Sequence, residues 1–148
     1  MHRLIYASRF SARFPRERQD QEYALNRIVH VSARNNQAAG LTGMLLLHRG
    51  HFLQALEGAE EAIGQAYEKI LQDPRHEAVR LIALTPAYRR EFGDFSMCAR
   101  RVSAADDAML EDLERRAADL SALDPAQAID LLTAVRDTQA RALLAAMA

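Results

Sequence analysis

The chain has 148 residues, of which 49% are hydrophobic and 26% are charged, and its formal net charge is -1. Such a composition indicates one globular domain with a sizeable core, and it excludes an intrinsically disordered chain. The nearly neutral charge gives no electrostatic reason to expect nucleic acid or an anionic membrane as the main partner.

Cysteine usage and the N-terminal sequence indicate where the protein works. The single cysteine, Cys98, cannot form an internal disulfide, and no signal peptide precedes the first strand-like run, so we predict a cytoplasmic location. No apolar stretch approaches the roughly 20 residues that span a bilayer, so we predict no membrane association. The histidines are scattered and lack the spacing of metal-binding motifs, so we predict no metal site.

Residues 1–103 carry the signals of five strands and two helices. Strands are predicted where apolar residues run together or alternate, at residues 3–8, 41–47, 51–58, 78–84 with an extension at 87–88, and 95–102. Helices are predicted where apolar residues recur at helical spacing, at residues 20–39 and 60–72. Asp20 is expected to cap the first helix and Gly40 to end it, and Asp73-Pro74 is expected to stop the second.

The order of these elements, βαββαββ, predicts an α+β fold of the ferredoxin-like kind, with a mixed sheet and two helices on one face. From residue 104 the composition shifts to Ala, Leu, Asp and Arg. Two further helices are predicted there, at residues 106–120 and 125–147, the second of which starts at Asp124-Pro125. We therefore divide the chain into a domain at residues 1–103 and a helical extension at residues 104–148.

The two C-terminal helices are expected to share an apolar stripe. Its members are Leu110, Leu113, Ile129, Leu132 and Val135. We expect this stripe to pack against the open face of the sheet, as amphipathic helices usually do. The alternative is a contact with the groove of a partner or with a second subunit.

Gln54 is the most unusual residue of the predicted sheet. In the alternating segment 51–58, Phe52, Gln54 and Leu56 share one face, so the primary amide is expected to be half buried. A buried amide needs partners for its carbonyl and for its NH2 group. The ordinary interpretation is a core glutamine that is bonded to a neighbouring main chain.

Further side chains are expected to gather in the groove that the two helices form over the sheet. They are Ile28, Ser32, Asn35 and Asn36 on one wall and Lys69 on the other. A slot with apolar sides and amide groups suits a planar heterocycle with several hydrogen-bond donors and acceptors. Arg75 and His76 follow the second helix and are placed to meet an anionic tail. The alternatives are a frayed helix end at the asparagines and a solvated cap at Arg75 and His76.

Five short motifs follow one another along the first 100 residues. They are Arg3-Leu4-Ile5-Tyr6-Ala7-Ser8, Ala33-Arg34-Asn35-Asn36 with Gly40-Leu41-Thr42-Gly43, Phe52-Leu53-Gln54-Ala55-Leu56-Glu57-Gly58, Asp73-Pro74-Arg75-His76 and Phe95-Ser96-Met97. In their order and spacings they resemble the BLUF family, the blue-light sensors that use flavin, and the resemblance covers about residues 2–103. The resemblance implies a blue-light photoreceptor that binds flavin non-covalently, with FAD as the first expectation and FMN or riboflavin as the other forms.

The resemblance also implies a role for each matching residue. Tyr6 and Gln54 match the photoactive pair of the family, in which the glutamine bridges the tyrosine hydroxyl to the N5 and O4 edge of the flavin. Asn36 matches the asparagine that holds the O4/N3 edge. The other expected flavin contacts are Asn35 and Lys69 on the pyrimidine side, Arg75 and His76 near the ribityl and phosphate end, and Ser8, Ile28 and Ser32 along the slot.

The implied signal is a change of hydrogen bonds around the flavin. A phenol is a feasible one-electron donor to excited flavin, and a glutamine has a donor end and an acceptor end, so it relays the proton and settles in a new orientation or tautomer. The flavin returns to its oxidised form with different hydrogen bonds and absorbs further to the red. No substrate turns over, so the protein is not expected to be an enzyme. The change is expected to pass through the last strand and the C-terminal helices to a separate partner protein, and a homo-oligomer is expected.

One position departs from the family pattern. Phe95 stands where the family often has Trp, and the chain contains no tryptophan. Phe cannot donate a hydrogen bond, so an exchange of tryptophan positions cannot carry the signal there. Met97 is retained, and we expect it to lie near Gln54 and to move when the amide changes.

Two other classes of protein stay open at this point. A small ferredoxin-like enzyme, of the acylphosphatase or monooxygenase kind, would use Arg75 or His76 on an anionic substrate, but no nucleophile–base pair stands out in the sequence. A structural dimerisation module is the other class. A flavin absorption spectrum separates both of them from the photoreceptor.

Overall fold

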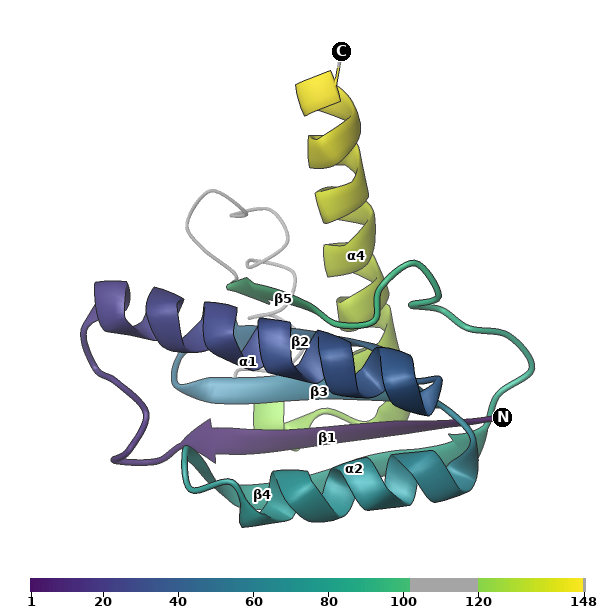
Figure 1. The fold of residues 1–148 in the computed structure, drawn as a ribbon, viewed down its shortest axis with the longest axis horizontal. Coiled ribbons are helices and arrows are strands. Elements are labelled where there is room, and N and C mark those ends of the chain that lie inside the picture. The colour runs from purple at the N-terminus through teal and green to yellow at the C-terminus, as the bar shows by residue number, and fades with distance from the viewer. Residues whose placement is uncertain (102–119, 148) are drawn as a thin grey trace.

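The computed structural model of the protein describes residues 1–101 and 120–147 (Figure 1). The strands are β1 (His2–Phe10), β2 (Thr42–His48), β3 (His51–Gly58), β4 (His76–Pro86) and β5 (Cys98–Arg101). The helices are α1 (Arg18–Ala39), α2 (Glu60–Gln72) and α4 (Pro125–Met147), and a short 3-10 turn, η2, spans Leu120–Ala122.

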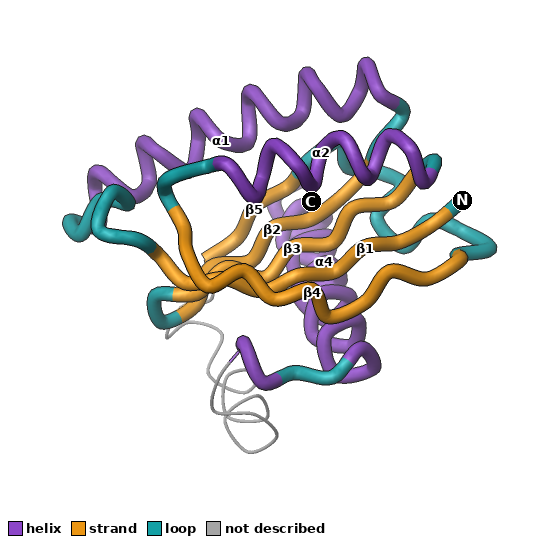
Figure 2. The backbone as a smooth tube through the Cα atoms, turned by 90° about the horizontal axis from the view of Figure 1, so that it is seen from below, coloured by secondary structure: helices purple, strands orange, loops and turns teal. Residues whose placement is uncertain are grey.

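The five strands form one mixed sheet in the order β4-β1-β3-β2-β5. Neighbouring strands are antiparallel except β5, which runs parallel to β2. Helices α1 and α2 cover one face of the sheet, and α4 lies on the other face (Figure 2). This is the ferredoxin-like arrangement with one strand added at the β2 edge, and it confirms the predicted fold class.

Alternation along the central strands explains their continuous burial. On β1, Leu4 and Tyr6 belong to the core beneath α2, whereas Ile5 and Ala7 belong to the core on the α4 side. Gln54 of β3 faces the same side as Tyr6, to which it is hydrogen-bonded. A sheet that is covered on both faces needs apolar residues on both sides of its strands, and these strands therefore read as nearly unbroken apolar runs.

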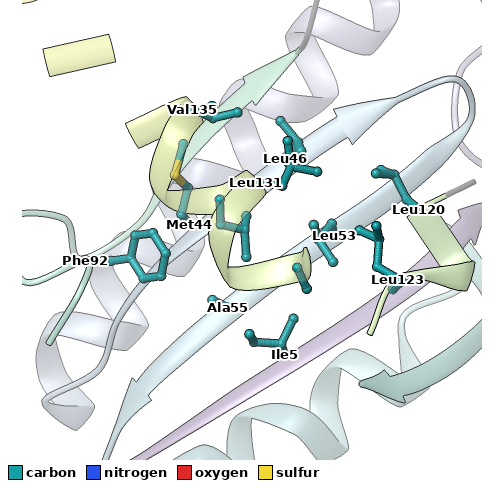
Figure 3. Packing of buried hydrophobic residues seen from close by; sticks show 13 residues of the cluster. Ile5, Met44, Leu46, Leu53, Ala55, Phe92, Leu120, Leu123, Leu131 and Val135 are labelled. Carbon is teal, nitrogen blue, oxygen red and sulfur yellow. The ribbon is translucent and has the colours of Figure 1, made fainter. Parts of the chain in front are cut away.

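The second C-terminal helix packs where the sequence predicts it, on the open face of the sheet. The first half of α4 and the η2 turn share one core with β1, β2 and β3 (Figure 3). The labelled members of this core are Ile5, Met44, Leu46, Leu53, Ala55, Phe92, Leu120, Leu123, Leu131 and Val135. Of the predicted stripe, Ile129, Leu132 and Val135 contact this core, while Leu110 and Leu113 and the rest of the first C-terminal helix up to residue 119 lie outside the described residues.

The start of α4 is fixed by two reciprocal hydrogen bonds. The main-chain N–H of Gln127 donates to Oδ1 of Asp124 at 2.8 Å, and the N–H of Asp124 donates to Oε1 of Gln127 at 3.0 Å. This capping box satisfies donors that the first turn of a helix leaves unpaired, and it confirms the predicted start at Asp124-Pro125. The division of the chain at residue 103 stays a prediction.

The first helix begins earlier than predicted. α1 starts at Arg18, and Glu17 occupies its N-cap position without a side-chain hydrogen bond. Asp20 therefore lies within the first turn. Its carboxylate interacts favourably with the positive end of the helix dipole, but it is not the N-cap residue. The end of the helix is as predicted, because Gly40 adopts a left-handed φ of 70° and closes the last turn with main-chain hydrogen bonds.

Most strand boundaries differ from the prediction by one or two residues, and the differences that matter most are the end of β4 and the start of β5. β4 ends at Pro86, and the predicted extension at residues 87–88 is wrong because the partner strand β1 begins opposite Pro86. β5 begins at Cys98 rather than at residue 95. Phe95 belongs to the loop before this strand. Its carbonyl accepts a hydrogen bond from the N–H of Gly43, which ties the loop to the start of β2.

Two glycines offer a matched test of how closely the strands approach. A Cβ atom at Gly43 would stand 2.3 Å from the carbonyl oxygen of Ala55, which is backbone and cannot move aside, whereas at Gly64 in α2 nothing lies within 4 Å. We expect Gly43→Ala to lower the free energy of unfolding by about 1–3 kcal/mol or more. Gly64→Ala should raise it by about 0.5–1 kcal/mol, because alanine is the better helix former. Urea unfolding measures both changes, and an undiminished stability of Gly43→Ala would contradict the close approach.

Candidate functional site

A cavity of about 270 Å³ lies between α1 and α2 above the central strands. Ten of the eleven residues that the sequence singles out line it, namely Tyr6, Ile28, Ser32, Asn35, Asn36, Gln54, Lys69, Arg75, His76 and Met97. The eleventh, Ser8, is fully buried and is not part of the wall. The fold therefore brings together side chains from three strands (β1, β3 and β4), two helices and the residues just before β4 and β5.

Tyr6 and Gln54 face each other across the β1–β3 pair, where they are direct partners in register. The Tyr6 hydroxyl donates a hydrogen bond to Oε1 of Gln54, and both side chains are buried. Burial raises the pKa of the Tyr6 phenol far above its ordinary value, and the nearby Asp73 carboxylate and Tyr67 phenol raise it further. The phenol is therefore protonated at any physiological pH, and its proton is directed at the glutamine carbonyl.

The other end of the Gln54 amide contacts Met97. Nε2 of Gln54 lies 3.6 Å from Sδ of Met97, so the predicted proximity of these two residues is confirmed. Both ends of the amide are bonded to side chains, and the interpretation of a core glutamine bonded to main chain is wrong. Because a thioether is a weak acceptor, the nitrogen end of the amide is held less firmly than the oxygen end.

Asn36 closes the cavity near the end of α1. Its side chain is buried, and Nδ2 donates to the main-chain carbonyl of Ser96 at 2.8 Å. Oδ1 of Asn36 makes no hydrogen bond within the described residues. Because none of the fully buried side-chain polar atoms there lacks a partner, this oxygen keeps some exposure, and Asn36 lines the cavity. The burial of Asn36 is not that of a frayed helix end, whereas its neighbour Asn35 lines the cavity from an exposed position.

Asp73 holds Arg75 at the exposed end of the cavity. Nε of Arg75 donates to Oδ1 and Oδ2 of Asp73 at 2.9 and 3.0 Å, and Nη2 donates to Oδ2. Burial acts to raise the pKa of the Asp73 carboxyl, but the hydrogen bonds and charge of Arg75 outweigh it and hold that pKa below its ordinary value. Nη1 of Arg75 keeps no intramolecular partner within the described residues, so the guanidinium can still receive an anion.

Ser8 lies behind the cavity wall, where it contacts His76. Oγ of Ser8 lies 2.8 Å from Nδ1 of His76, and Nε2 of His76 lies 2.5 Å from the carbonyl oxygen of Ile70. The imidazole also meets Tyr6 and Phe52 edge-on, with ring centroids 6.1 Å apart in both cases. His76 is therefore bonded within the protein, and the alternative of a solvated cap is wrong for this residue.

Glu57, which was not predicted as a site residue, anchors the segment between β4 and β5. Its carboxylate is fully buried, with Oε2 accepting from the main-chain N–H of Glu91 and Oε1 from that of Phe92, both at 2.8 Å. Arg3 neutralises it, with Nη2 of Arg3 2.8 Å from Oε2. Through these bonds the end of β3 fixes the path of the segment that leads to Met97.

The same segment reaches α4 through Glu91. Nη1 of Arg136 donates to the main-chain carbonyl of Glu91 at 2.8 Å and to its carboxylate at 3.0 Å. The side-chain bond from Arg136 is the main reason why the pKa of the Glu91 carboxyl is below its ordinary value. Because the segment continues to Ser96 and Met97, which contact cavity residues, it connects the cavity with α4.

Several lining residues were absent from the predicted set. The polar and aromatic ones are Phe52, Gln65 and Asp73. Spacing carries a signal for two of them, since Phe52 shares the face of Gln54 by strand alternation and Gln65 stands one helical turn before Lys69. Asp73 was predicted as part of a helix stop and as a member of the motif Asp73-Pro74-Arg75-His76, but not as a cavity residue, although an aspartate two residues before an arginine is also a local ion-pair signal.

The cavity suits the ring of a flavin better than a whole dinucleotide. Its volume of about 270 Å³ lies just below the roughly 300–1,000 Å³ that small-molecule clefts span. The amides of Gln54 and Asn36 stand at its buried end, and apolar side chains such as Ile28 and Leu45 form its walls. Lys69 and Arg75 line it from more exposed positions, where an anionic tail would leave the cavity.

Within residues 1–101 and 120–147, no group of three or more His, Cys, Asp and Glu side chains stands in a metal-binding arrangement. Over the same ranges, none of the helices combines the length and the apolar character that crossing a bilayer requires.

Known sequences resemble this chain over the part that forms the sheet and the cavity. A family model described as "BLUF: Sensors of blue-light using FAD" matches residues 1–98. The blue light- and temperature-regulated antirepressor BluF of Escherichia coli (strain K12) is 37% identical over 73 residues, which are 49% of this chain and 18% of that protein. The photoactivated adenylate cyclase subunit alpha of Euglena gracilis is 34% identical over 97 residues, 66% of this chain and 9% of that protein. The chain thus spans less than a fifth of the length of either relative.

Solved structures share the fold. BlrB, described as a BLUF protein in its dark state, has a TM-score of 0.71 at 33% identity, and the match covers 90% of this chain and 96% of that one. BlsA in its photo-activated state has a TM-score of 0.76 over 88% of this chain and 91% of that one, but at 22% identity it supports the fold alone. BlrP1 of Klebsiella pneumoniae, solved with FMN and cyclic diGMP, has a TM-score of 0.64 at 28% identity over 86% of this chain and 32% of that one.

Proposed function

The chain belongs to the BLUF family of blue-light sensors, and we propose that it is itself a photoreceptor that binds flavin without a covalent bond in the cavity between α1 and α2. The observation that carries this proposal is the buried Tyr6–Gln54 hydrogen bond on the cavity wall. It places a one-electron donor next to a side chain that can both accept and donate a hydrogen bond.

The cavity residues divide into three groups around the proposed flavin. Ile28 and Ser32 line the ring from α1, and Asn36 offers its open Oδ1 to the polar edge of the ring. Asn35 and Lys69 also line the cavity and are proposed to contact the pyrimidine side of the ring. Arg75 and His76 stand where the ribityl and phosphate groups would leave the cavity. The ring is common to FAD, FMN and riboflavin, and FAD is the form that the family description names.

The flavin supplies the absorption of blue light and, once excited, the capacity to accept one electron. Tyr6 is the proposed donor, and its phenol proton becomes strongly acidic when the electron leaves. The hydrogen bond to Oε1 of Gln54 gives that proton a path. Once the electron and the proton have returned to Tyr6, Gln54 is left in a new orientation or tautomer, and its weak contact with Met97 is the bond that breaks most easily.

Output is proposed to leave through the segment before β5. Met97 contacts the amide, and the same segment is bonded to α4 through Glu91 and Arg136. The Escherichia coli relative is named an antirepressor and the Euglena relative a cyclase subunit, so sensors of this family occur with different outputs. For this chain we propose a separate partner protein in the cytoplasm, with self-association as the second route.

The alternative of a small enzyme has one observation in its favour, the contact between Ser8 and His76. A serine hydroxyl 2.8 Å from an imidazole nitrogen is the geometry of an activated nucleophile. However, Ser8 is fully buried and does not line the cavity, so its hydroxyl cannot reach a substrate there. We therefore propose photosensing without catalytic turnover.

Absorption spectroscopy of the purified chain tests the proposal. The protein should be yellow, and its flavin spectrum should shift to the red under blue light and return in the dark. If the protein is purified without flavin, incubation with FAD, FMN or riboflavin should restore this behaviour. A folded protein that stays colourless after all three incubations would refute the photoreceptor function.

Met97→Ala tests the route to α4. We expect this variant to keep the red shift, because Tyr6 and Gln54 are unchanged, but to lose most of the light-induced change in α4. Hydrogen exchange of the α4 amides in light and dark measures that change, and Leu71→Ala, at an exposed leucine that does not line the cavity, is the control. If the α4 response and the photocycle were both intact in Met97→Ala, the proposed route would be wrong.

A further inference from the structure

The imidazole of His76 has both of its nitrogens occupied within the protein. Nε2 lies 2.5 Å from the carbonyl oxygen of Ile70, and Nδ1 lies 2.8 Å from Oγ of Ser8. A carbonyl oxygen only accepts hydrogen bonds, so Nε2 must carry a proton. In the neutral ring, Nδ1 then accepts from the Ser8 hydroxyl, and the tautomer is set by these two partners. No nitrogen is left to contact a ligand.

These bonds tie together three elements that form the cavity. Ser8 belongs to β1, His76 is the first residue of β4, and Ile70 lies in the last turn of α2. Between them the ring also fills the space beside Tyr6 and Phe52, two residues of the cavity wall. The imidazole therefore acts as a spacer that sets how far the end of α2 stands above the sheet.

The neighbouring Arg75 is placed differently. Its side chain is 40% exposed, and Asp73 occupies Nε and Nη2 but leaves Nη1 without an intramolecular partner in the described part of the chain. A guanidinium held in this way is oriented by its carboxylate and still presents a donor edge to an anion. His76 thus has both ring nitrogens hydrogen-bonded within the protein, whereas Arg75 keeps one donor group available for a ligand.

We propose that His76 is a positioning residue that sets the width of the flavin slot, and that it does not contact the anionic tail. Of these two residues, only Arg75 contacts the anionic tail of the flavin. This inference rests on the proposed function, since it concerns the cavity that is proposed to hold flavin. It predicts that His76 contributes equally to the binding affinity for every form of flavin. Arg75 should contribute only to the affinity for the forms that carry a phosphate.

Binding of riboflavin and FMN to the flavin-free full-length chain separates the two roles, because only FMN carries a phosphate. We expect His76→Leu to weaken both ligands by about tenfold, which corresponds to the net worth of about one hydrogen bond. Ser8→Ala should weaken both to a similar or smaller extent. Arg75→Gln should weaken FMN by about tenfold and leave riboflavin unchanged.

A conservative replacement distinguishes hydrogen bonding from space filling. The amide of His76→Gln can accept from Ser8 and donate to Ile70, so this variant should recover much of the affinity that His76→Leu loses. In the unmodified protein, nitrogen NMR should show His76 as the Nε2-protonated tautomer, and Ser8→Ala should shift the Nδ1 resonance. This measurement needs no flavin and remains decisive if a His76 variant does not fold.

Two results would overturn the inference. One is a loss of FMN binding in His76→Leu with riboflavin binding unchanged, which would make His76 a phosphate contact. The other is the Nδ1-protonated tautomer in the NMR spectrum. Failure of the proposed function itself looks different, because the unmodified chain would then bind neither riboflavin nor FMN. Thermal unfolding of each flavin-free variant shows whether weaker binding only reflects lost stability.

Discussion

A Tyr6→Phe protein is expected to bind flavin but to show no reversible red shift under blue light. The substitution removes only the hydroxyl, which donates to Oε1 of Gln54 and makes no other hydrogen bond within the described residues. The ring keeps its contacts with Tyr67 and His76, whose centroids lie 5.8 and 6.1 Å away, so the shape of the cavity is preserved. Without the phenol, the proposed electron donor to the flavin is absent. Gln54 also loses the proton that the Tyr6 hydroxyl directs at its carbonyl.

The variant also has an expected cost in stability. It leaves the buried Oε1 of Gln54 without a donor, and an unsatisfied buried acceptor costs on the order of 1–3 kcal/mol. Flavin titration and spectra before, during and after blue light, compared at equal flavin occupancy, measure the two effects separately. Tyr88→Phe is the matched control, because Tyr88 is fully exposed and should change neither binding nor the spectrum. A complete red shift in Tyr6→Phe would remove Tyr6 from the proposed chemistry.

The faces of the strand residues could be predicted because alternation has a period of two. Once residues 3–8 and 51–58 are placed in strands, the side on which Tyr6 and Gln54 point follows from counting. Alternation does not give the register, and a shift of two residues would pair Gln54 with a different side chain on the same face. The family motifs implied a contact between the Tyr6 hydroxyl and Gln54, and the β1–β3 register places these two residues opposite each other.

Contacts between residues far apart in the sequence, in strands or in loops, could not be predicted in this way. Ser8 and His76 are 68 positions apart, and Glu57 bonds main-chain groups 34 and 35 positions away in a loop without periodicity. A carboxylate at the end of a strand is usually solvated, so its sequence gives no sign of burial. Local signals can mislead as well. Asp20 is a good cap residue, but the helix starts before it, and tertiary packing decides such boundaries.

Glu57→Ala is expected to cause the largest loss of stability among the substitutions considered. The Glu57 carboxylate is fully buried and bonded to Arg3 and to the N–H groups of Glu91 and Phe92. Removing one partner of a buried ion pair leaves an uncompensated charge, which costs about 3–5 kcal/mol. Arg3 is only 16% exposed and cannot fully regain water without moving. Two main-chain donors lose their acceptor at the same time. Urea unfolding measures the change, and Glu68→Ala, on the exposed face of α2, should stay within about 0.5 kcal/mol of the unmodified chain.

The effect of Glu57→Ala should also reach the cavity, because the released segment carries Ser96 and Met97. The bond from Asn36 to the Ser96 carbonyl and the contact from Gln54 to Met97 depend on the path of this segment. We therefore expect faster hydrogen exchange at residues 91–97 and a weaker light response of α4 under conditions where the variant is still folded. Normal exchange in this segment, together with a large loss of stability, would show that Glu57 supports the sheet but not the route from the cavity to α4. In that case the bonds between Arg136 and Glu91 would be what holds residues 91–97 against α4. A variant in which both residues are replaced would then test the route from the cavity to α4.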